Sequence, residues 1–98
     1  MSSEAIVRNV VVTNCHGLHA RPCLAIVNTV KGREASVTVR KGSEIADASN
    51  FHALMCFAAT QGTELVISAT GPEAEPVVNR LASLFADEFG ISYPMSDA

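Results

Sequence analysis

Hydrophobic and polar residues follow two different periods along this chain, and the period changes at short segments rich in Gly, Asn, Thr and Ser. Residues 5–12 are rich in Val and Ile, and residues 35–40 and 64–70 alternate apolar with polar side chains. A further short segment, residues 43–48, follows the turn-forming pair Lys41-Gly42. These four segments predict β-strands, and the alternation predicts a sheet with one buried and one solvent-exposed face.

Two segments between the predicted strands are expected to be helices. The first spans residues 20–31, where apolar side chains recur at helical spacing and Gly32 provides a C-terminal stop. Its apolar positions are Leu24, Val27 and Val30, with Cys23 and Ile26 beside them. The second is short, residues 51–57, apolar nearly all round and preceded by Asn50, which is a good N-cap residue.

A third helix is predicted after the last strand. It begins near Glu73, because Pro76 is compatible only with the first turn of a helix, and Gly90 ends it. Its predicted buried stripe consists of Val78, Leu81, Phe85 and Phe89.

The element order is therefore βαββαβα. A strand-helix-strand unit occurs twice in this order, and right-handed crossovers place all three helices on one face of a four-stranded antiparallel sheet. This arrangement is an α+β open-faced sandwich. At 98 residues the chain has room for one domain. We expect residues 5–90 to be ordered and residues 91–98 to form a flexible tail.

Composition narrows the possible functions. Hydrophobic residues make up 48% of the chain, enough for a core, yet no apolar segment reaches the roughly 18 residues needed to span a bilayer. The N-terminus lacks a signal-peptide pattern, and three cysteines without a CxxC pair fit a reducing compartment. A net charge of −3 with only 7 Lys and Arg argues against nucleic acid as the main partner. We therefore expect a cytoplasmic monomer without membrane insertion or a cofactor.

Charge is unevenly distributed along the sequence. Residues 1–50 contain six basic and four acidic side chains, whereas residues 51–98 contain one basic and six acidic side chains. The stretch of residues 5–33 has no carboxylate but contains Arg8, Arg21, Lys31 and Arg33. It could face an anion or an acidic protein surface, although ordinary solvated charges explain it equally well.

The most informative segment is residues 17–22, Gly-Leu-His-Ala-Arg-Pro, where a loop becomes a helix. Pro22 has no amide hydrogen and must lie in the first turn, which places His19 at or beside the N-cap, while the initial glycine permits a sharp bend. The backbone N–H groups of Ala20 and Arg21 then have no partner within the helix and lie at the positive end of its dipole. Such a helix end is suited to binding phosphate.

His19 would lie where a bound anion lies. Imidazole titrates near ~6.5 in model peptides, so its neutral, nucleophilic form is available at neutral pH. Arg21, two residues on, can offer two parallel hydrogen bonds to phosphoryl oxygens. Reversible phosphorylation of His19 is one interpretation of this pattern. The other is that His19 only caps the helix and that Arg21 is solvated.

The same segment, residues 17–22, resembles the active-site signature of HPr, the histidine-containing phosphocarrier of the phosphoenolpyruvate-dependent sugar phosphotransferase system. Residues 60–69, Thr-Gln-Gly-Thr-Glu-Leu-Val-Ile-Ser-Ala, resemble that family's loop and fourth strand. The resemblance covers about residues 5–89 and implies the open-faced sandwich fold. It also implies a covalent phosphoryl carrier rather than a turnover enzyme. His19 would accept a phosphoryl group on its δ nitrogen from phosphorylated enzyme I, with Arg21 assisting, and pass it to an enzyme IIA.

Two positions depart from the family pattern. His16 stands where many members have a small polar residue, and a second imidazole there could alter the orientation or protonation of His19. Asn50 stands where the family often has the serine that HPr kinase phosphorylates, and asparagine accepts no phosphate. That form of regulation is therefore in doubt, and Ser49 is only a weak substitute.

The resemblance also implies that the second predicted helix meets partner proteins. Phe51 and Met55, and also His52, match the family's partner-binding positions. Core packing is the alternative interpretation for Phe51 and Met55, whereas His52 is expected at the surface as a partner contact rather than a metal ligand. A regulatory HPr paralogue that acts by protein binding is accordingly a second candidate function, consistent with the missing serine.

A metal-carrying protein is the third candidate, because four possible ligands lie within nine residues, namely Cys15, His16, His19 and Cys23. Small metal chaperones with this layout use a CxxC pair, and Arg21 would place a positive charge beside the cation, so we expect no metal site. Catalysis by Cys15 and His19 would lack an orienting carboxylate. We expect Cys23 to pack in the helix interior, Cys56 to pack within the second helix and Cys15 to be a loop thiol.

Overall fold

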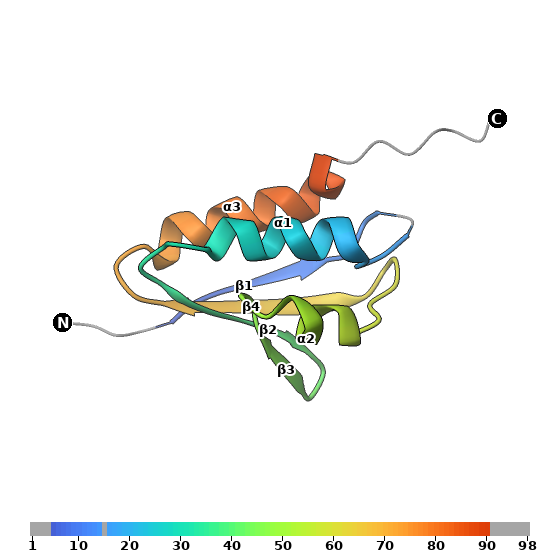
Figure 1. Ribbon diagram of the computed structural model, residues 1–98, viewed down its shortest axis with the longest axis horizontal. Helices are drawn as coiled ribbons and strands as arrows, with labels where there is room; N and C mark the ends of the chain where they lie inside the picture. Colours follow the sequence, from blue (N-terminus) through green and yellow to red (C-terminus); the bar gives the residue numbers. More distant parts are fainter. Residues whose placement is uncertain (1–4, 15, 91–98) are drawn as a thin grey trace.

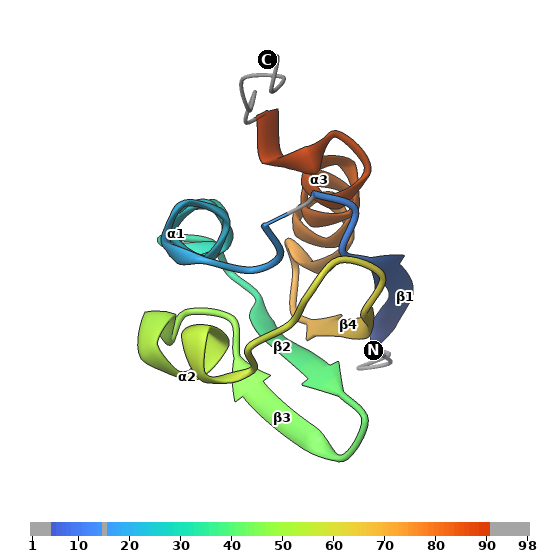
Figure 2. The ribbon, with the colours of Figure 1, turned by 90° about the vertical axis from the view of Figure 1, so that its right-hand side faces the viewer.

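The computed structural model describes residues 5–14 and 16–90. Three helices lie on one face of a single four-stranded sheet (Figure 1 and Figure 2). The strands are β1 (Ile6–Val11), β2 (Ser36–Lys41), β3 (Glu44–Asp47) and β4 (Glu64–Thr70). The helices are α1 (Ala20–Val30), α2 (Phe51–Cys56) and α3 (Ala74–Ala86), followed by a short 3-10 turn, η1 (Glu88–Gly90). The predicted order βαββαβα and the open-faced sandwich are confirmed.

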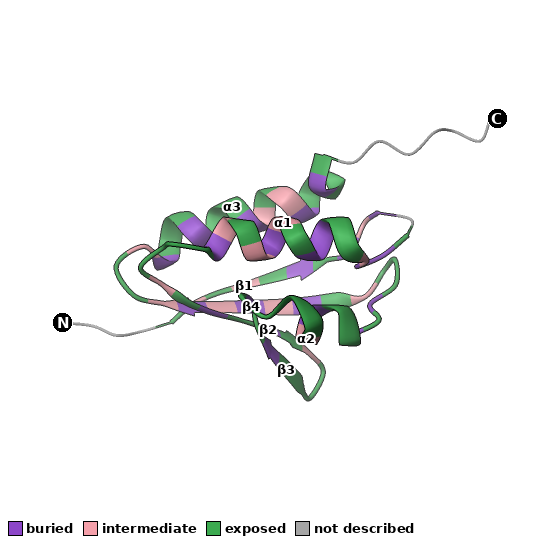
Figure 3. Ribbon diagram, viewed as in Figure 1, coloured by how far each residue is buried: buried purple, intermediate pink, exposed green. Residues whose placement is uncertain are grey.

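The sheet has one buried and one open face. Its strand order is β1-β4-β2-β3, and all three pairings are antiparallel. On the buried face Val10 lies opposite Leu65, and Val39 lies opposite Ile67. On the other face Ile45 is 65% exposed, and Figure 3 shows how burial changes along the strands. The solvent-exposed face predicted from the alternation is therefore present.

The buried face of α1 is rotated relative to the predicted one. Cys23, Ile26 and Val30 are buried, whereas Leu24 is 51% exposed. An α-helix advances by about 100° per residue, so positions spaced by three drift around it, whereas positions i, i+3 and i+7 stay on one face. The second set lies in the hydrophobic core, and Leu24 remains at the surface.

The last helix is shorter than predicted and ends at Ala86. Asp87 and Glu88 place negative charges at the negative end of the helix dipole, which disfavours further helical turns. Glu88 and Phe89 have left-handed φ angles of 52° and 59°. The reversal places the ring centroid of Phe89 4.8 Å from that of Phe85, in an edge-to-face contact. Phe89 is buried as predicted, but through a turn rather than a helical repeat.

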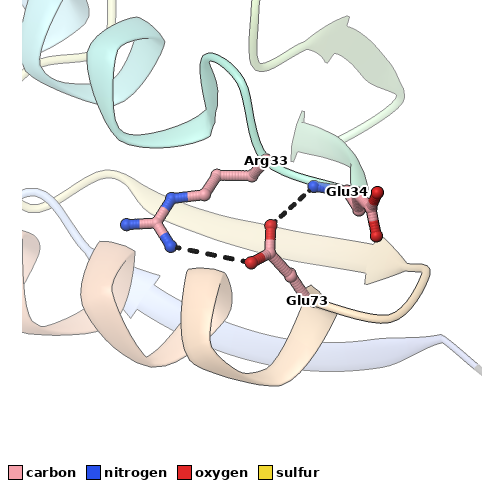
Figure 4. A network of polar contacts seen from close by, with 3 residues as sticks. All are labelled: Arg33, Glu34 and Glu73. Atoms are coloured by element: carbon pink, nitrogen blue, oxygen red, sulfur yellow. Dashed lines mark hydrogen bonds and ion pairs between the residues drawn. The ribbon is translucent and has the colours of Figure 1, made fainter.

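Polar contacts join two turns at the end of the molecule where α1 leads into β2 and β4 leads into α3. The Glu73 carboxylate accepts the Glu34 backbone N–H at 2.7 Å and lies 4.0 Å from the Arg33 guanidinium (Figure 4). The Glu73 N–H in turn donates to the Glu34 carbonyl at 3.0 Å. The side chains of Glu73 and Arg33 therefore help to hold these two turns together.

The remaining element boundaries lie within one residue of the predicted ones. Lys41 belongs to β2, and the tight turn into β3 begins at Gly42, which has a φ of 61°. Within the described part of the chain, no helix has the length and apolar character that crossing a bilayer requires. Residues 91–98 lie outside the described residues, so the flexible tail stays a prediction.

Candidate functional site

The N-terminus of α1 has the geometry predicted from the position of its proline. The helix begins at Ala20, and His19 is its N-cap residue, with an extended backbone (φ −118°, ψ −164°). The first i→i−4 hydrogen bond runs from the Cys23 N–H to the His19 carbonyl at 3.0 Å. Pro22 has no N–H, and the N–H groups of Ala20 and Arg21 precede the first i−4 acceptor that the helix supplies. Two backbone donors are thus presented beside His19.

The charges at this helix end favour an external anion. The first turn of α1 contains no acidic residue, so no carboxylate of the helix itself neutralises the positive end of the dipole. His19 is partly exposed and does not cap the helix with its side chain, and Arg21 is exposed. An accessible imidazole, two backbone donors and a guanidinium in the same turn can together hold and receive a phosphoryl group.

A glycine in a left-handed conformation sets the path of the loop into α1. Gly17 has a φ of +70°, and its N–H donates to the Asn14 carbonyl at 3.0 Å. The next N–H, of Leu18, donates to the Ala59 carbonyl at 2.8 Å, and the Leu18 side chain is buried. A Cβ at position 17 would lie 2.3 Å from the Ala59 carbonyl oxygen, which no side chain tolerates. Glycine is therefore required here both for φ and for space.

Asn14 supports the same loop, although the sequence pattern predicts no role for it. Its side chain is fully buried, and its Nδ2 donates to the Gly17 carbonyl. Its Oδ1 is also buried and has no hydrogen-bond partner among the described residues. Asparagine three residues before a turn glycine is a recognisable pattern, because its amide can bond to the backbone of a following turn. Its burial depends on contacts between segments that are far apart in the sequence.

A second imidazole lies next to the first. His16 is exposed, and its ring centroid is 6.0 Å from that of His19, with the rings nearly perpendicular at 81°. The departure from the family pattern at this position therefore places another titratable ring within reach of any group bound to His19. Two of the four metal ligands suggested by the sequence are thus adjacent, while Cys15 lies outside the described residues.

The loop between α2 and β4 packs against the loop that precedes α1 (Figure 2). The Gly62 N–H donates to the Val12 carbonyl at 2.8 Å, and the Gln61 Nε2 donates to the Thr13 carbonyl at 3.1 Å. Together with the Leu18 contact described above, these bonds tie residues 58–63 to residues 12–18. The two segments that carry the family resemblance are therefore neighbours in space.

The short helix α2 lies beside α1 (Figure 2). Two of its apolar side chains are exposed to solvent. Asn50 caps it as predicted, accepting the Ala53 N–H at 3.0 Å. Leu54 is fully buried, whereas Phe51 is 39% exposed and Met55 is 37% exposed. Core packing, the alternative considered for the last two residues, is therefore not what the structure shows.

The thiols differ sharply from one another. Cys23 is fully buried as expected, and burial raises the pKa of its thiol to about 11, which makes it a poor ligand or nucleophile. The expected packing of Cys56 is wrong, because this residue is exposed on α2 and its Sγ lies 3.5 Å from the Nε2 of His52. His52 lies at the surface as predicted. No group of three or more possible metal ligands occurs within residues 5–14 and 16–90.

Comparison with known proteins agrees with this geometry. The model of the family described as "PTS HPr component phosphorylation site" matches residues 6–87. The chain belongs to the HPr family. Phosphocarrier protein HPr of Haemophilus influenzae is 35% identical over 77 residues, which is 79% of this chain and 91% of that protein. Phosphocarrier protein NPr of Escherichia coli is 32% identical over 84 residues, 84% of this chain and 92% of that protein.

The fold agrees with solved structures of HPr proteins. The crystal structure of HPr-C-His from Thermoanaerobacter tengcongensis superimposes with a TM-score of 0.84 at 26% identity, covering 90% of this chain and 99% of that one. HPr-family proteins are phosphocarriers of the phosphotransferase system, which carry a phosphoryl group rather than act as enzymes. The family inferred from two short motifs is therefore confirmed over most of the chain.

Proposed function

We propose that this HPr-family protein carries a phosphoryl group on Nδ1 of His19, receives it from phosphorylated enzyme I and passes it to enzyme IIA-type acceptors. The observation that carries the proposal is the placement of His19 as the partly exposed N-cap of α1. There it lies beside the backbone N–H groups of Ala20 and Arg21, which the helix leaves without i−4 acceptors.

The transfer exchanges one bond to phosphorus for another. The lone pair of Nδ1 attacks the phosphorus while the bond from phosphorus to the donor atom of enzyme I breaks, and the donor atom keeps that electron pair. The proton that the imidazole of His19 loses is taken up by the donor group or by water. Passing the group to an acceptor reverses these roles. Negative charge stays on the phosphoryl oxygens throughout, so the helix end and Arg21 act on it at every stage.

The expected energies fit a reversible carrier. A helix N-terminus stabilises a nearby anion by about 0.3–1 kcal/mol, and a hydrogen bond to a charged group contributes about 1.5–3 kcal/mol. Since about 1.4 kcal/mol corresponds to a tenfold change in an equilibrium constant, these contributions favour the phosphorylated form without trapping it. We assign the guanidinium of Arg21 the role of a fixed positive charge beside the phosphoryl oxygens.

Donor and acceptor proteins must both reach the same imidazole, which calls for a small and rapidly released contact. The exposed apolar side chains Phe51 and Met55 on α2, next to α1, support a docking role for this helix, with His52 contributing a polar contact. Apolar side chains that are over a third exposed gain most from being covered by a partner.

A regulatory role exerted through protein binding is the second candidate function, and Asn50 favours it. The residue has no hydroxyl for a kinase to phosphorylate, and its side chain already caps α2. The hydroxyl of the neighbouring Ser49 donates to the Asp47 carboxylate at 2.6 Å, and hydrogen bonds from Ser49 lower the pKa of Asp47. Control by phosphorylation at the start of α2 is therefore not part of the proposal.

Incubation with phosphoenolpyruvate and enzyme I tests the carrier function. We expect one acid-labile, alkali-stable phosphoryl group per chain, detected by mass spectrometry at alkaline pH, and none in the variant His19→Ala. His16→Asn is the matched control and must still accept the group. An adduct that persists in His19→Ala would assign the acceptor to another residue. If several enzyme I preparations all fail to phosphorylate the chain, the carrier function is wrong, and the regulatory protein that acts by binding becomes the first candidate.

A further inference from the structure

Two exposed side chains of types that commonly bind metals project from the same side of α2. His52 and Cys56 are four residues apart, both are exposed, and His52 Nε2 lies 3.5 Å from Cys56 Sγ. The opposite side of this short helix is fixed by the buried side chains of Leu54 and Phe57. The phosphocarrier function assigns no role to Cys56.

The separation of the two atoms matches two neighbouring corners of a zinc tetrahedron. With Zn–S of about 2.3 Å, Zn–N of about 2.0–2.1 Å and a tetrahedral angle, sulfur and nitrogen lie about 3.6 Å apart. Thiolate and imidazole are ligands that Zn²⁺ prefers. The metal would take the place of the proton between Sγ and Nε2, and the thiol proton would pass to water. No rearrangement of α2 is required.

We propose that His52 and Cys56 form half of a Zn²⁺ site that a second copy of this chain completes. The described residues contain no group of three His, Cys, Asp or Glu that could hold a metal, so among them this pair has no further ligand, and we assign the other two ligands to the second copy. A twofold arrangement of two α2 helices supplies the Cys2His2 set typical of closed structural zinc sites.

Two further observations favour a second copy. The sequence of α2, Phe-His-Ala-Leu-Met-Cys, contains no Lys, Arg, Asp or Glu, and two thiolates balance the charge of one Zn²⁺. Phe51 and Met55 are exposed on the same helix, and a contact between two α2 helices would cover them. The ion supplies the ligand bonds, and the apolar contact lowers the cost of bringing the chains together.

The bridged dimer would hide the surface of α2. Under the proposed function this surface docks enzyme I and enzyme IIA-type proteins, so Zn²⁺ would slow phosphoryl transfer without touching His19. This consequence rests on the proposed function, whereas the metal site does not. Two measurements distinguish the metal site from the proposed function. Metal binding is measured in the absence of any partner protein, and phosphorylation is measured in the presence of EDTA.

Zn²⁺ titration of the full chain tests the site, with a non-chelating reductant present. We expect one Zn²⁺ per two chains by calorimetry and a monomer-to-dimer shift by sedimentation velocity, reversed by EDTA. Co²⁺ as a probe should give the near-ultraviolet thiolate charge-transfer band and the intense visible bands of a tetrahedral site. Absence of binding, or one Zn²⁺ per chain without dimerisation, would overturn the proposal.

Single substitutions locate the metal. Cys56→Ser and His52→Gln each change an exposed side chain, so we expect the fold to persist and the Zn²⁺-dependent dimer to be lost in both. His16→Gln and Cys15→Ser are the matched controls and should retain the dimer. If the controls lose Zn²⁺ binding while Cys56→Ser keeps it, the metal belongs to the loop before α1 and the proposal is wrong.

Discussion

The helices α1 and α3 start in similar ways. Each follows a turn in which a glycine with positive φ lies against a backbone carbonyl, Gly17 against Ala59 and Gly71 against Glu34. A Cβ would lie 2.3 Å from the carbonyl oxygen in the first case and 2.7 Å in the second. Both turns are therefore fixed by contacts between segments far apart in the sequence.

The chemistry of the two helix ends is nevertheless opposite. Glu73 is the N-cap residue of α3 and Glu75 lies in its first turn, so the protein's own carboxylates occupy the positive end of that dipole. At α1 the N-cap residue is His19, and the first turn contains no acid but an arginine, Arg21. The comparison shows that the two helix N-termini differ in charge, because the chain provides carboxylates at the start of α3 and none in the first turn of α1.

The largest effect is expected where the turn before α1 is blocked. Gly17→Ala forces a side chain into the Ala59 carbonyl and a non-glycine residue into a left-handed conformation, and should lower the free energy of unfolding by about 3 kcal/mol. Gly32→Ala is the control, because Gly32 has a φ of 74° but nothing lies near its Cβ position, and should cost about 1 kcal/mol. Equal urea midpoints for the two variants would contradict the steric argument.

Removing the positive charge at the start of α1 should affect transfer rather than folding. Arg21→Ala loses a hydrogen bond to a charged phosphoryl group, and phosphorylation by enzyme I should slow about 10- to 100-fold. The side chain is exposed, so the free energy of unfolding should change by less than about 0.5 kcal/mol. Rapid-quench kinetics and urea denaturation measure the two effects. Parallel losses in both would show that Arg21 is structural.

An acid placed at the start of α1 should make it resemble α3. Ala20→Glu puts a carboxylate beside the phosphoryl position and should slow phosphorylation by at least about tenfold through like-charge repulsion. The same charge should stabilise the helix by about 0.3–1 kcal/mol. Ala20→Gln has the same shape without the charge and should transfer at close to the original rate. A slow Gln variant would point to crowding instead of charge.

The N-terminus of α2 offers a third case, in which a neutral cap satisfies a backbone donor. Asn50→Ala removes the acceptor for the Ala53 N–H and should lower the unfolding free energy by about 1 kcal/mol. Asn50→Ser restores both a cap and the family's serine and should lie within a few tenths of a kcal/mol of the original protein. Thermal unfolding distinguishes them, and equal loss in both variants would rule out capping as the cause.

The smallest effect is expected at α3. Glu73→Gln removes the charge next to the helix end and the 4.0 Å ion pair with Arg33, while the amide oxygen can still accept the Glu34 N–H. Both partners are well exposed, so the unfolding free energy should fall by only about 0.5 kcal/mol. The loss should shrink at high salt in urea titrations. A loss that does not depend on salt would mean that shape and not charge holds this turn.

Much of the fold and the central geometry of the site could be predicted because local rules determine them. Pro22 restricts where α1 can begin, and this restriction was enough to place His19 at or beside the N-cap, where the structure has it. The strict alternation of β4 gave its bounds, Glu64–Thr70, without error. These features depend on residues that are close together in the sequence.

What could not be predicted depends on contacts between distant segments. The exposure of Leu24 and Cys56 is decided by which side of each helix meets the core, and the short apolar pattern of α2 does not specify a side. The end of α3 depends on the left-handed turn through Phe89. Asn14 is buried because the loops around residues 17 and 59 meet. None of these four features has a signal in the neighbouring sequence that is strong enough to predict it.

The hydrogen bond from the Leu18 N–H to the Ala59 carbonyl has a consequence for a chain that is still being synthesised. A nascent polypeptide that has not yet produced the segment around residue 59 contains the histidine and arginine but has nothing to hold them in place. Under the proposed function, enzyme I would therefore act only on molecules whose two halves have come together. The proposed phosphorylation would then require a folded chain, and unfinished chains would not consume phosphoenolpyruvate.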